Sequence, residues 1–532
     1  MILLAFGAGF SRSRVLIYGF LVCLPTAISA VLVFWNLKSL GLSHWDEYNY
    51  VITAIWFAGR KDGVFTIYEP PGFPFSVGLL FKLFGVQDYI AIATSGLYAV
   101  MTVVLVTFIG AKFFDLKVGI VASILLTVSP LFIAYSRMAL TDVAFTFFFT
   151  ASVFSMYIAL RSGRLYHLIS AGVLFAACNT MKYNGVMALL VPILYMPVLL
   201  RGTKKSEVLR NGYRHLKFLV ILCLPTLVFG VLFLFLLGVG GSIRDLASFR
   251  LLHIMTLDTL AKGFAKFQAG ALLPHGVQSG GGGQLAVRPL GEAVYYLQVM
   301  FYYVPLPILL LAIVGLATKK LEDNPHLFTV FWAVLSFVEI SSISARYSRA
   351  LLPVLPPLAI LAAVGITRLQ SIWHFEPKRP RLKSLFRGAI LALLLALVFG
   401  TSLIPLIQTV DVSHNAYRET GQILQKVAGN STVLAETQPV IAIYYRTKFG
   451  DLTDANLAHA NFLVVDFIGA ERYRLTIQLL EKQGRLKQVT SIHNDALDLV
   501  YLDSRSIDRL KTWNYYDIVI YRVENATRQG TQ

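Results

Sequence analysis

The sequence predicts an α-helical polytopic membrane protein, with about eleven transmembrane helices and a small C-terminal α/β domain. Of its 532 residues, 56% are hydrophobic and only 14% are charged, against about 25% charged in an ordinary soluble domain. Long apolar runs recur up to about residue 410 and then stop. Beyond that point, short helical and extended patterns alternate. A soluble fold over the whole length is therefore excluded.

The apolar runs predict spans one after another along the chain. The first follows Arg12 and Arg14, and it is long enough to be a retained anchor rather than a cleaved signal. A further apolar segment, 74–85, is too short to cross a bilayer and suits a juxtamembrane or re-entrant helix. The predicted spans lie near 15–36, 88–111, 118–136, 141–160, 165–181, 184–200, 216–238, 292–316, 326–343, 349–366 and 388–407.

Charge predicts the orientation of these spans. Residues 1–410 hold 33 basic and 15 acidic side chains, and residues 411–532 hold 14 of each. With the N-terminus in the cytoplasm, the cytoplasmic segments collect 20 cations, as the positive-inside rule requires. The basic surplus thus reports loop orientation in a lipid bilayer, and we expect no nucleic-acid partner. The plasma membrane and the endoplasmic reticulum are both compatible with this pattern.

Three large pieces are then exoplasmic: the loops 37–87 and 239–291, and the domain 411–532, which follows a transmembrane domain 1–410. The second loop contains four glycines at 280–283, which suit a mobile lid or a plain linker. In the C-terminal domain, the patterns predict helices over 414–428 and 439–446. They predict extended segments over 432–436, 462–466, 496–502 and 517–521.

Ionisable groups on the exoplasmic side run against the topological bias and indicate a functional site. The carboxylates are Asp46, Glu47 and Asp142, and the cations are Arg137, Lys182, Arg346 and Arg349. Carboxylates and cations at one membrane surface suit acid–base chemistry on an anionic lipid headgroup. Simpler interpretations remain open: helix capping for Asp142, interfacial anchoring for Lys182 and Arg349, and a solvated surface charge for Glu47.

The order of these motifs resembles a known family. The chain reads WDEY at 45–48, EPPGFP at 69–74, SRMALTD at 136–142, MKYNG at 181–185, and RY at 346–347 ahead of a proline-rich helix. This order resembles the polytopic C-type (GT-C) glycosyltransferases, and within them the protein O-mannosyltransferase and aminoarabinose transferase superfamily (glycosyltransferase family 39-like). The resemblance covers about 15–410, and the tail resembles the soluble domain often appended to these enzymes.

The resemblance implies an inverting glycosyltransferase. Its donor would be a sugar on a polyprenyl or dolichyl phosphate carrier, and its acceptor a protein hydroxyl, a lipid or a glycan. Asp46 takes the place of the general base, with Glu47 secondary, and Asp142 matches an acidic residue that helps build the site. Lys182 and Arg346 match cations near the lipid phosphate, Arg137 is a weaker candidate, and Tyr347 and Glu69 complete the substrate-binding set.

Two points qualify this assignment. Aminoarabinose-type relatives often have lysine before the Pro-Pro pair, where this chain has Glu69, so that phosphate contact is not expected here. Some relatives hold a divalent metal ion near the site, and Asp46 and Asp142 are then its candidate ligands. The alternative function is a transporter or flippase of a lipid-linked sugar, which would place charges near the membrane midplane, often within repeated halves.

Overall fold

A computed structural model gives the architecture. It describes residues 12–65, 70–200, 220–225, 228, 289–317, 325–341, 347–372, 380–411, 415–429, 431–435, 438–444, 449–450, 456, 460–466, 469–470, 473–494 and 517–524. The candidate residues Glu69 and Arg346 lie outside these ranges. So do the glycines at 280–283, all of the loop 239–291 before Pro289, and most of the predicted span 216–238.

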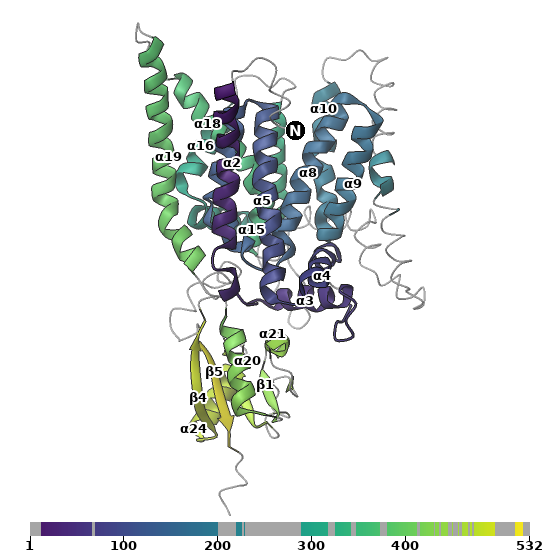
Figure 1. Ribbon diagram of the computed structural model, residues 1–532, viewed down its shortest axis with the longest axis vertical. Helices are drawn as coiled ribbons and strands as arrows, with labels where there is room; N and C mark the ends of the chain where they lie inside the picture. Colours follow the sequence, from purple (N-terminus) through teal and green to yellow (C-terminus); the bar gives the residue numbers. More distant parts are fainter. Residues whose placement is uncertain are drawn as a thin grey trace, which may run out of the picture.

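The bundle is built from apolar helices, most of which are upright in Figure 1. Within the described residues, five helices are long and apolar enough to cross a membrane, or up to seven if each of two bent pairs counts as one span. Helices therefore form where hydropathy predicts them, whereas the total of eleven stays a prediction. The elements of this part are α2 (Arg12–Phe34), α5 (Asp88–Phe113), α6 (Leu116–Thr127), α7 (Pro130–Ser136), α8 (Thr141–Ser162), α9 (Leu165–Met181), η2 (Tyr183–Leu189), α10 (Leu190–Leu200), α15 (Pro289–Tyr303), α16 (Leu306–Leu316), α17 (Pro325–Ser341), η3 (Ser348–Val354), α18 (Leu355–Ile372) and α19 (Pro380–Asp411).

Two predicted spans are broken. The segment predicted as 118–136 consists of α6 and α7, which meet at 66°. Pro130 explains the break, because it has no N–H to continue the helix and disfavours helical geometry at Ser129. The segment predicted as 292–316 consists of α15 and α16, bent by 119° around Pro305. The first break lets the chain after α7 turn at the end of the bundle, where Arg137 lies.

Close helix packing in the bundle depends on small residues. A Cβ added at Gly315 of α16 would lie 1.9 Å from the carbonyl oxygen of Leu361, and one added at Gly365 of α18 would lie 2.0 Å from that of Leu311. Neither position has room for a side chain. The two backbones therefore approach as closely as in other small-residue contacts of membrane helices.

Two short helices lie at one end of the bundle, next to the C-terminal domain (Figure 1). They are α3 (Trp45–Phe57) and α4 (Gly72–Phe84). The second coincides with the apolar segment that was too short to span. Tyr50 of α3 and Phe73 of α4 are both buried, and their rings meet edge to face with centroids 5.5 Å apart. These helices form a platform that holds the first large predicted loop, 37–87, against the bundle.

The C-terminal part contains a five-stranded sheet with the order β2-β1-β3-β5-β4. Strand β1 is parallel to β2 and β3, whereas β5 is antiparallel to β3 and β4. One face packs on α20, and the other on α24. The predicted strand 496–502 lies outside the described residues. The elements are α20 (Ala416–Val427), β1 (Val433–Ala435), α21 (Gln438–Tyr444), β2 (Phe449–Gly450), β3 (Phe462–Val465), α24 (Arg474–Lys482), β4 (Leu486–His493) and β5 (Asp517–Val523).

Candidate active site

The N-terminus of α3 places the first two candidate carboxylates. His44 is the N-cap residue, and its Nδ1 accepts a hydrogen bond from the backbone N–H of Asp46 at 3.1 Å. Glu47 reaches back to complete a capping box. Consecutive helical residues point about 100° apart. Asp46 and Glu47 therefore face different surroundings although they are adjacent in the chain.

Glu47 is fully buried and acts as a clamp. Its Oε2 accepts from the backbone N–H groups of Ser43 and His44, at 2.6 and 2.8 Å, and from the Ser43 hydroxyl. Its Oε1 accepts from the N–H of Ala139 at 2.6 Å. Burial raises the pKa of Glu47, although these donors favour its charged form. The carboxyl group thus ties the first loop to the segment between α7 and α8.

Asp46 belongs to a chain of alternating charges. Its Oδ2 accepts a hydrogen bond from Nη2 of Arg349 at 2.6 Å, and Nη1 of the same guanidinium lies 3.8 Å from Oδ2 of Asp142. The other oxygen of Asp142 accepts from Nζ of Lys182. The outer side chains, Asp46 and Lys182, are 26% and 27% exposed, whereas Arg349 and Asp142 are 8% and 2% exposed. The two ends of this row of charges, Asp46 and Lys182, are accessible to a ligand, whereas its two middle residues are buried.

Arg349 controls the acidity of Asp46. Burial alone would raise the pKa of this carboxyl group, but the charges of Arg349 and His44 and the hydrogen bond from Arg349 outweigh burial, so the pKa lies below its ordinary value of 3.8. Asp46 is therefore ionised at neutral pH and engaged with a cation. A carboxylate held in this way is a weak base as long as the guanidinium stays in place.

Side-chain hydrogen bonds hold together the elements that supply this chain. The hydroxyl groups of Tyr135 in α7 and Ser348 in η3 lie 2.6 Å apart, next to Arg349. Thr141, at the start of α8, donates to the carbonyl of Met181 at the end of α9, at 2.8 Å. Ser95 of α5 donates to the carbonyl of Leu140, also at 2.8 Å. The ends of four helices are thereby fixed around the charges, and each of these contacts is buried.

Arg137 is placed differently from the other candidate cations. Only 1% of it is exposed, and its Nη1 donates to carbonyls at the end of α2, with the bond to Trp35 at 2.8 Å. Its Nη2 donates to the carbonyl of Val410 near the end of α19, at 2.9 Å. A cation suits the carbonyl ends of two helices. This geometry favours a structural clamp, and a contact between Arg137 and substrate stays a prediction.

The last of the sequence motifs places two side chains at the site, Tyr347 and Arg349. Tyr347 is exposed, and its ring lies under the guanidinium of Arg349, with 4.8 Å from Cζ to the ring centroid. The sequence pointed to Arg346 as a phosphate ligand, which stays a prediction because Arg346 lies outside the described residues. Arg349, three residues later, joins Asp46 and Asp142. The available signal was the RYSR spacing, which repeats a cation after nearly one helical turn.

The two candidate metal ligands do not fit a divalent ion in this arrangement. Asp46 and Asp142 are bridged by a guanidinium, and Asp142 also accepts from an ammonium group. These cations stand where a metal would have to bind. In the described part of the chain, no three His, Cys, Asp or Glu side chains are grouped as metal ligands. We therefore derive no step of the chemistry through a metal ion.

Part of the chain is similar to a known family of proteins. Residues 68–229, which carry Arg137, Asp142 and Lys182, match the model of the family described as dolichyl-phosphate-mannose-protein mannosyltransferase. No curated protein sequence is significantly similar to the chain.

Several solved structures have a similar fold. ArnT from Cupriavidus metallidurans, bound to undecaprenyl phosphate, has a TM-score of 0.55 and 15% identity, over 94% of this chain and 98% of that chain. The oligosaccharyltransferase AglB from Archaeoglobus fulgidus, in complex with an inhibitory peptide and a dolichol-phosphate, has a TM-score of 0.52 and 12% identity, over 90% of this chain and 74% of that chain. A complex of the Archaeoglobus fulgidus oligosaccharyltransferase with Zn and sulfate also has a TM-score of 0.52 and 12% identity, over 86% of this chain and 69% of that chain.

The family match covers the segment with three of the site residues, and the fold is shared over most of the chain. Residues 68–229 are thus similar to this mannosyltransferase family, and the protein is an integral membrane protein with the fold of ArnT and of the archaeal oligosaccharyltransferase.

Proposed function

We propose that the protein is a C-type (GT-C) glycosyltransferase of the family 39-like superfamily, and that it transfers a sugar, with inversion, from a polyprenyl or dolichyl phosphate carrier to an acceptor on the exoplasmic face of the membrane. The observation that carries this proposal is the alternating chain of Asp46, Arg349, Asp142 and Lys182 at the ends of their helices. ArnT and AglB, which share the fold, are bound to undecaprenyl phosphate and to a dolichol-phosphate, respectively. An anionic carrier would find two cations here next to a carboxylate.

The chemical step uses Asp46 as general base. An acceptor hydroxyl oxygen forms a bond to the anomeric carbon while the bond from that carbon to the phosphate oxygen breaks. The hydroxyl proton passes to Asp46, and the electron pair of the broken bond leaves with the phosphate. Arg349 and Lys182 are positioned to stabilise this growing negative charge where water is scarce. We include Arg346 in the phosphate site as a prediction, since it lies outside the described residues.

Donor binding would also activate the base. In this structure Arg349 is paired with Asp46, and this pairing lowers the pKa of the carboxyl group. A carrier phosphate offers Arg349 a second anion that suits its planar fork. As the guanidinium turns to the phosphate, burial is left to raise the pKa of Asp46 and to make it a stronger base. The base would then be strong only when a donor is present.

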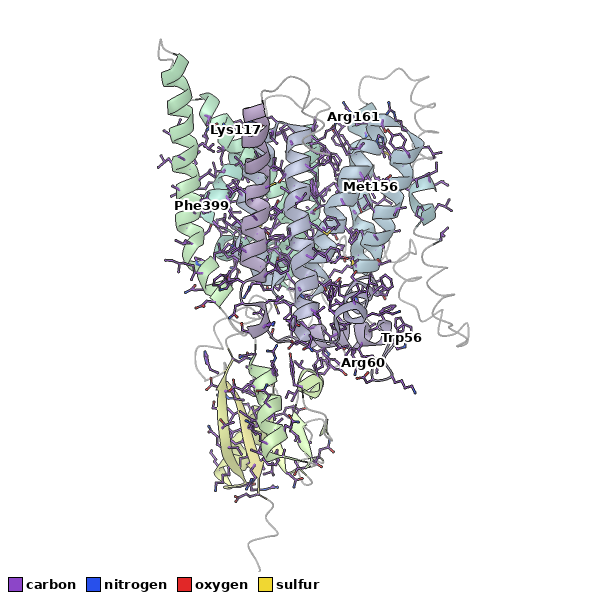
Figure 2. All side chains as sticks on the ribbon, viewed as in Figure 1. Trp56, Arg60, Lys117, Met156, Arg161 and Phe399 are labelled. Atoms are coloured by element: carbon purple, nitrogen blue, oxygen red, sulfur yellow. The ribbon has the colours of Figure 1, made fainter. Side chains whose placement is uncertain are left out.

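The orientation follows from the ends of the bundle. Figure 2 shows Lys117 and Arg161 at one end, and Trp56 and Arg60 at the other end, near the C-terminal domain. Lys117 and Arg161 belong to the basic segments, which we place in the cytoplasm by the positive-inside rule. The candidate site and the C-terminal domain would then be exoplasmic, at the surface of the plasma membrane or in the lumen of the endoplasmic reticulum.

A transporter is less well supported by the placement of the charges. Asp142 is in the first turn of α8, and Lys182 directly follows the last residue of α9. Both helix ends belong to one end of the bundle rather than to its middle. A transport site near the midplane would require ionisable groups within the helices. Transfer chemistry explains a surface site without this requirement.

The experiment compares wild type with Asp46→Asn, purified and supplied with polyprenyl-phosphate sugars. The substitution keeps the shape of the side chain and removes its basicity, so acceptor-dependent release of free carrier phosphate should fall by about 10²–10⁴-fold. Glu419→Gln, an exposed carboxylate in α20, is the matched control and should keep full activity. Near-normal release from folded Asp46→Asn would reject Asp46 as the base. Absence of release by wild type from every donor would reject the proposed function.

A further inference from the structure

A cavity lies outside the row of ion-paired side chains. It has a volume of about 850 Å³ and opens between α3, the turn that precedes α5, and the helices α20 and α21 of the C-terminal domain. Neither Asp46, Arg349, Asp142 nor Lys182 lines it. Arg60, which lines this cavity, is labelled in Figure 2 at the edge of the bundle that faces this domain. The volume is that of a site for a ligand larger than a single sugar ring.

Both guanidinium groups in this cavity are already engaged. Arg418 donates to Asp88 through Nε and Nη2, and to the carbonyls of Lys38 and Leu40. Arg60 forms a forked pair with Asp62, at 2.9 and 3.0 Å. Each guanidinium is thus matched to a carboxylate. Lys38, the remaining cation of the lining, is exposed. A single exposed ammonium group is a weak site for an anion, so the uncharged polar groups decide which ligand the cavity suits.

The remaining polar groups suit hydroxyl groups. Gln422 and Gln425 are one turn apart on α20 and exposed, and Gln87 faces the same cavity from the bundle side. In the described part of the chain, no hydrogen bond joins these three amides to another residue. An amide both donates and accepts, as a sugar hydroxyl does. Tyr48 and Tyr89 also line the cavity and present amphipathic rings on which the faces of a sugar can pack.

Helix α3 forms a wall between the cavity and the candidate active site. Tyr48 lines the cavity and is two residues after Asp46, about 3 Å farther along the helix axis. Two residues also correspond to about 200° of rotation, so the two side chains leave the helix on nearly opposite sides. A ligand in the cavity would reach Asp46 only by extending around the N-terminus of α3. This requires a chain of several units.

We propose that this cavity binds a neutral oligosaccharide, and that a hydroxyl group at the end of this chain is the acceptor of the transfer reaction. The acceptor role of the oligosaccharide rests on the proposed function, whereas its binding in the cavity is independent of that function. The resemblance allows three classes of acceptor: a protein hydroxyl, a lipid or a glycan. This inference selects the glycan. A peptide acceptor or an acidic glycan is a separate outcome of the test.

The test measures binding to the full-length protein in nanodiscs by saturation-transfer NMR and titration calorimetry. The probes are mannotriose, maltotriose and chitotriose, with trigalacturonate as an acidic glycan and a threonine-rich peptide as a protein-like acceptor. We expect at least one neutral trisaccharide to bind, and Gln422→Leu/Gln425→Leu to weaken it by at least 10-fold. Gln483→Leu, an exposed glutamine after α24, is the matched control and should leave binding unchanged.

Two further measurements make the outcome decisive. Gln87→Leu, on the bundle side of the cavity, should weaken the same trisaccharide even if the double variant fails to fold. Absence of trisaccharide binding, binding unaffected by the variants, or binding of only the peptide or trigalacturonate would overturn the inference. Release of carrier phosphate is measured separately. Trisaccharide binding without any release would overturn the proposed function alone, and release without binding would overturn this inference alone.

Discussion

Asp46 and Glu47 have opposite surroundings although they are consecutive residues. Asp46 is partly exposed and pairs with a cation from a motif 303 residues later, whereas Glu47 is fully buried and accepts from backbone N–H groups. The first arrangement leaves a carboxylate oxygen accessible to a substrate. The second uses a carboxylate to fix the chain. At this scale, helix rotation is what separates the candidate base from the residue that fixes the chain.

The ion pair of Asp46 with Arg349 predicts a shift in the pH dependence of the enzyme. In wild type the acid limb of the pH profile of kcat/KM should lie below pH 3.8, because the pKa of Asp46 is lowered. Arg349→Gln removes the charge while burial still disfavours the carboxylate, so the acid limb should move to higher pH. The measurement is kcat/KM against pH for both proteins.

The same pair predicts where the stability of the fold changes. A carboxyl group with a lowered pKa stabilises the folded state above its ordinary pKa, and this contribution is lost as pH falls through the folded value.

For the pH profile of kcat/KM, Arg164→Gln, which changes an exposed cation at the cytoplasmic end of the predicted topology, serves as the control. An acid limb that stays in place in Arg349→Gln would show that another group sets it.

The sequence could predict which residues share one end of the bundle, but it could not predict their pairing. Asp46, Asp142 and Lys182 follow from the positive-inside bias, which is a property of loops. That Arg349 bridges the carboxylates depends on the direction of its side chain in η3, which hydropathy does not predict. The burial of Arg137 depends on two helix ends that are far apart in the sequence.

Among the elements, helices α2 and α19 end at one guanidinium. Arg137→Met removes the donors to the carbonyls of Trp35 and Val410 and leaves these acceptors unpaired. Buried groups left without a partner cost about 1–3 kcal/mol. We expect a lower Tm in detergent, with the affinity for polyprenyl phosphate unchanged in the protein that remains folded.

Arg161→Met provides the comparison for this substitution, since Arg161 lies at the other end of the bundle (Figure 2) and is exposed. Its Tm should stay close to that of wild type. The opposite result for Arg137→Met, an unchanged Tm with weaker carrier binding, would assign Arg137 to the donor phosphate instead of to the helix ends.

Apolar runs predicted most helices because a bilayer demands about 20 apolar residues for each span. The same reasoning failed where an element has no such run. Strand β4 is largely exposed or half-buried, so its residues lack the alternation of a half-buried strand, and neither it, β2 nor α24 was predicted. Hydropathy also treats a bent helix as a straight one, which is why the α6–α7 and α15–α16 breaks were missed.

At the scale of the whole molecule, a half-buried cluster docks the C-terminal domain on the bundle. Asp88 at the start of α5 accepts from Arg418 of α20 and from the hydroxyl of Tyr444 in α21, the latter at 2.8 Å. The Tyr444 hydroxyl also accepts from the N–H of Leu42 at 2.8 Å. Apolar contacts continue from the bundle into α20 without interruption. The domain and the bundle therefore share one core.

Asp88→Asn should loosen this docking. The substitution removes the charge that Arg418 pairs with, so α20 and α21 should exchange backbone hydrogens several-fold faster, while α5 and α8 should keep their protection. Hydrogen exchange with mass spectrometry measures both regions in one experiment. Glu481→Gln, on α24 at the far face of the sheet, is the control. Unchanged exchange in α20 would mean that apolar packing alone holds the domain.

The Arg137 clamp also constrains how the protein is made. Its guanidinium contacts carbonyls that precede it in the chain, but the carbonyl of Val410 is synthesised 273 residues later. At about 5–20 residues per second, roughly 14–55 s pass before that acceptor is synthesised. During this interval the nascent bundle holds a cation whose hydrogen bonds are incomplete. The rate of translation thus sets how long the hydrogen bonds of the Arg137 guanidinium stay incomplete in the nascent chain.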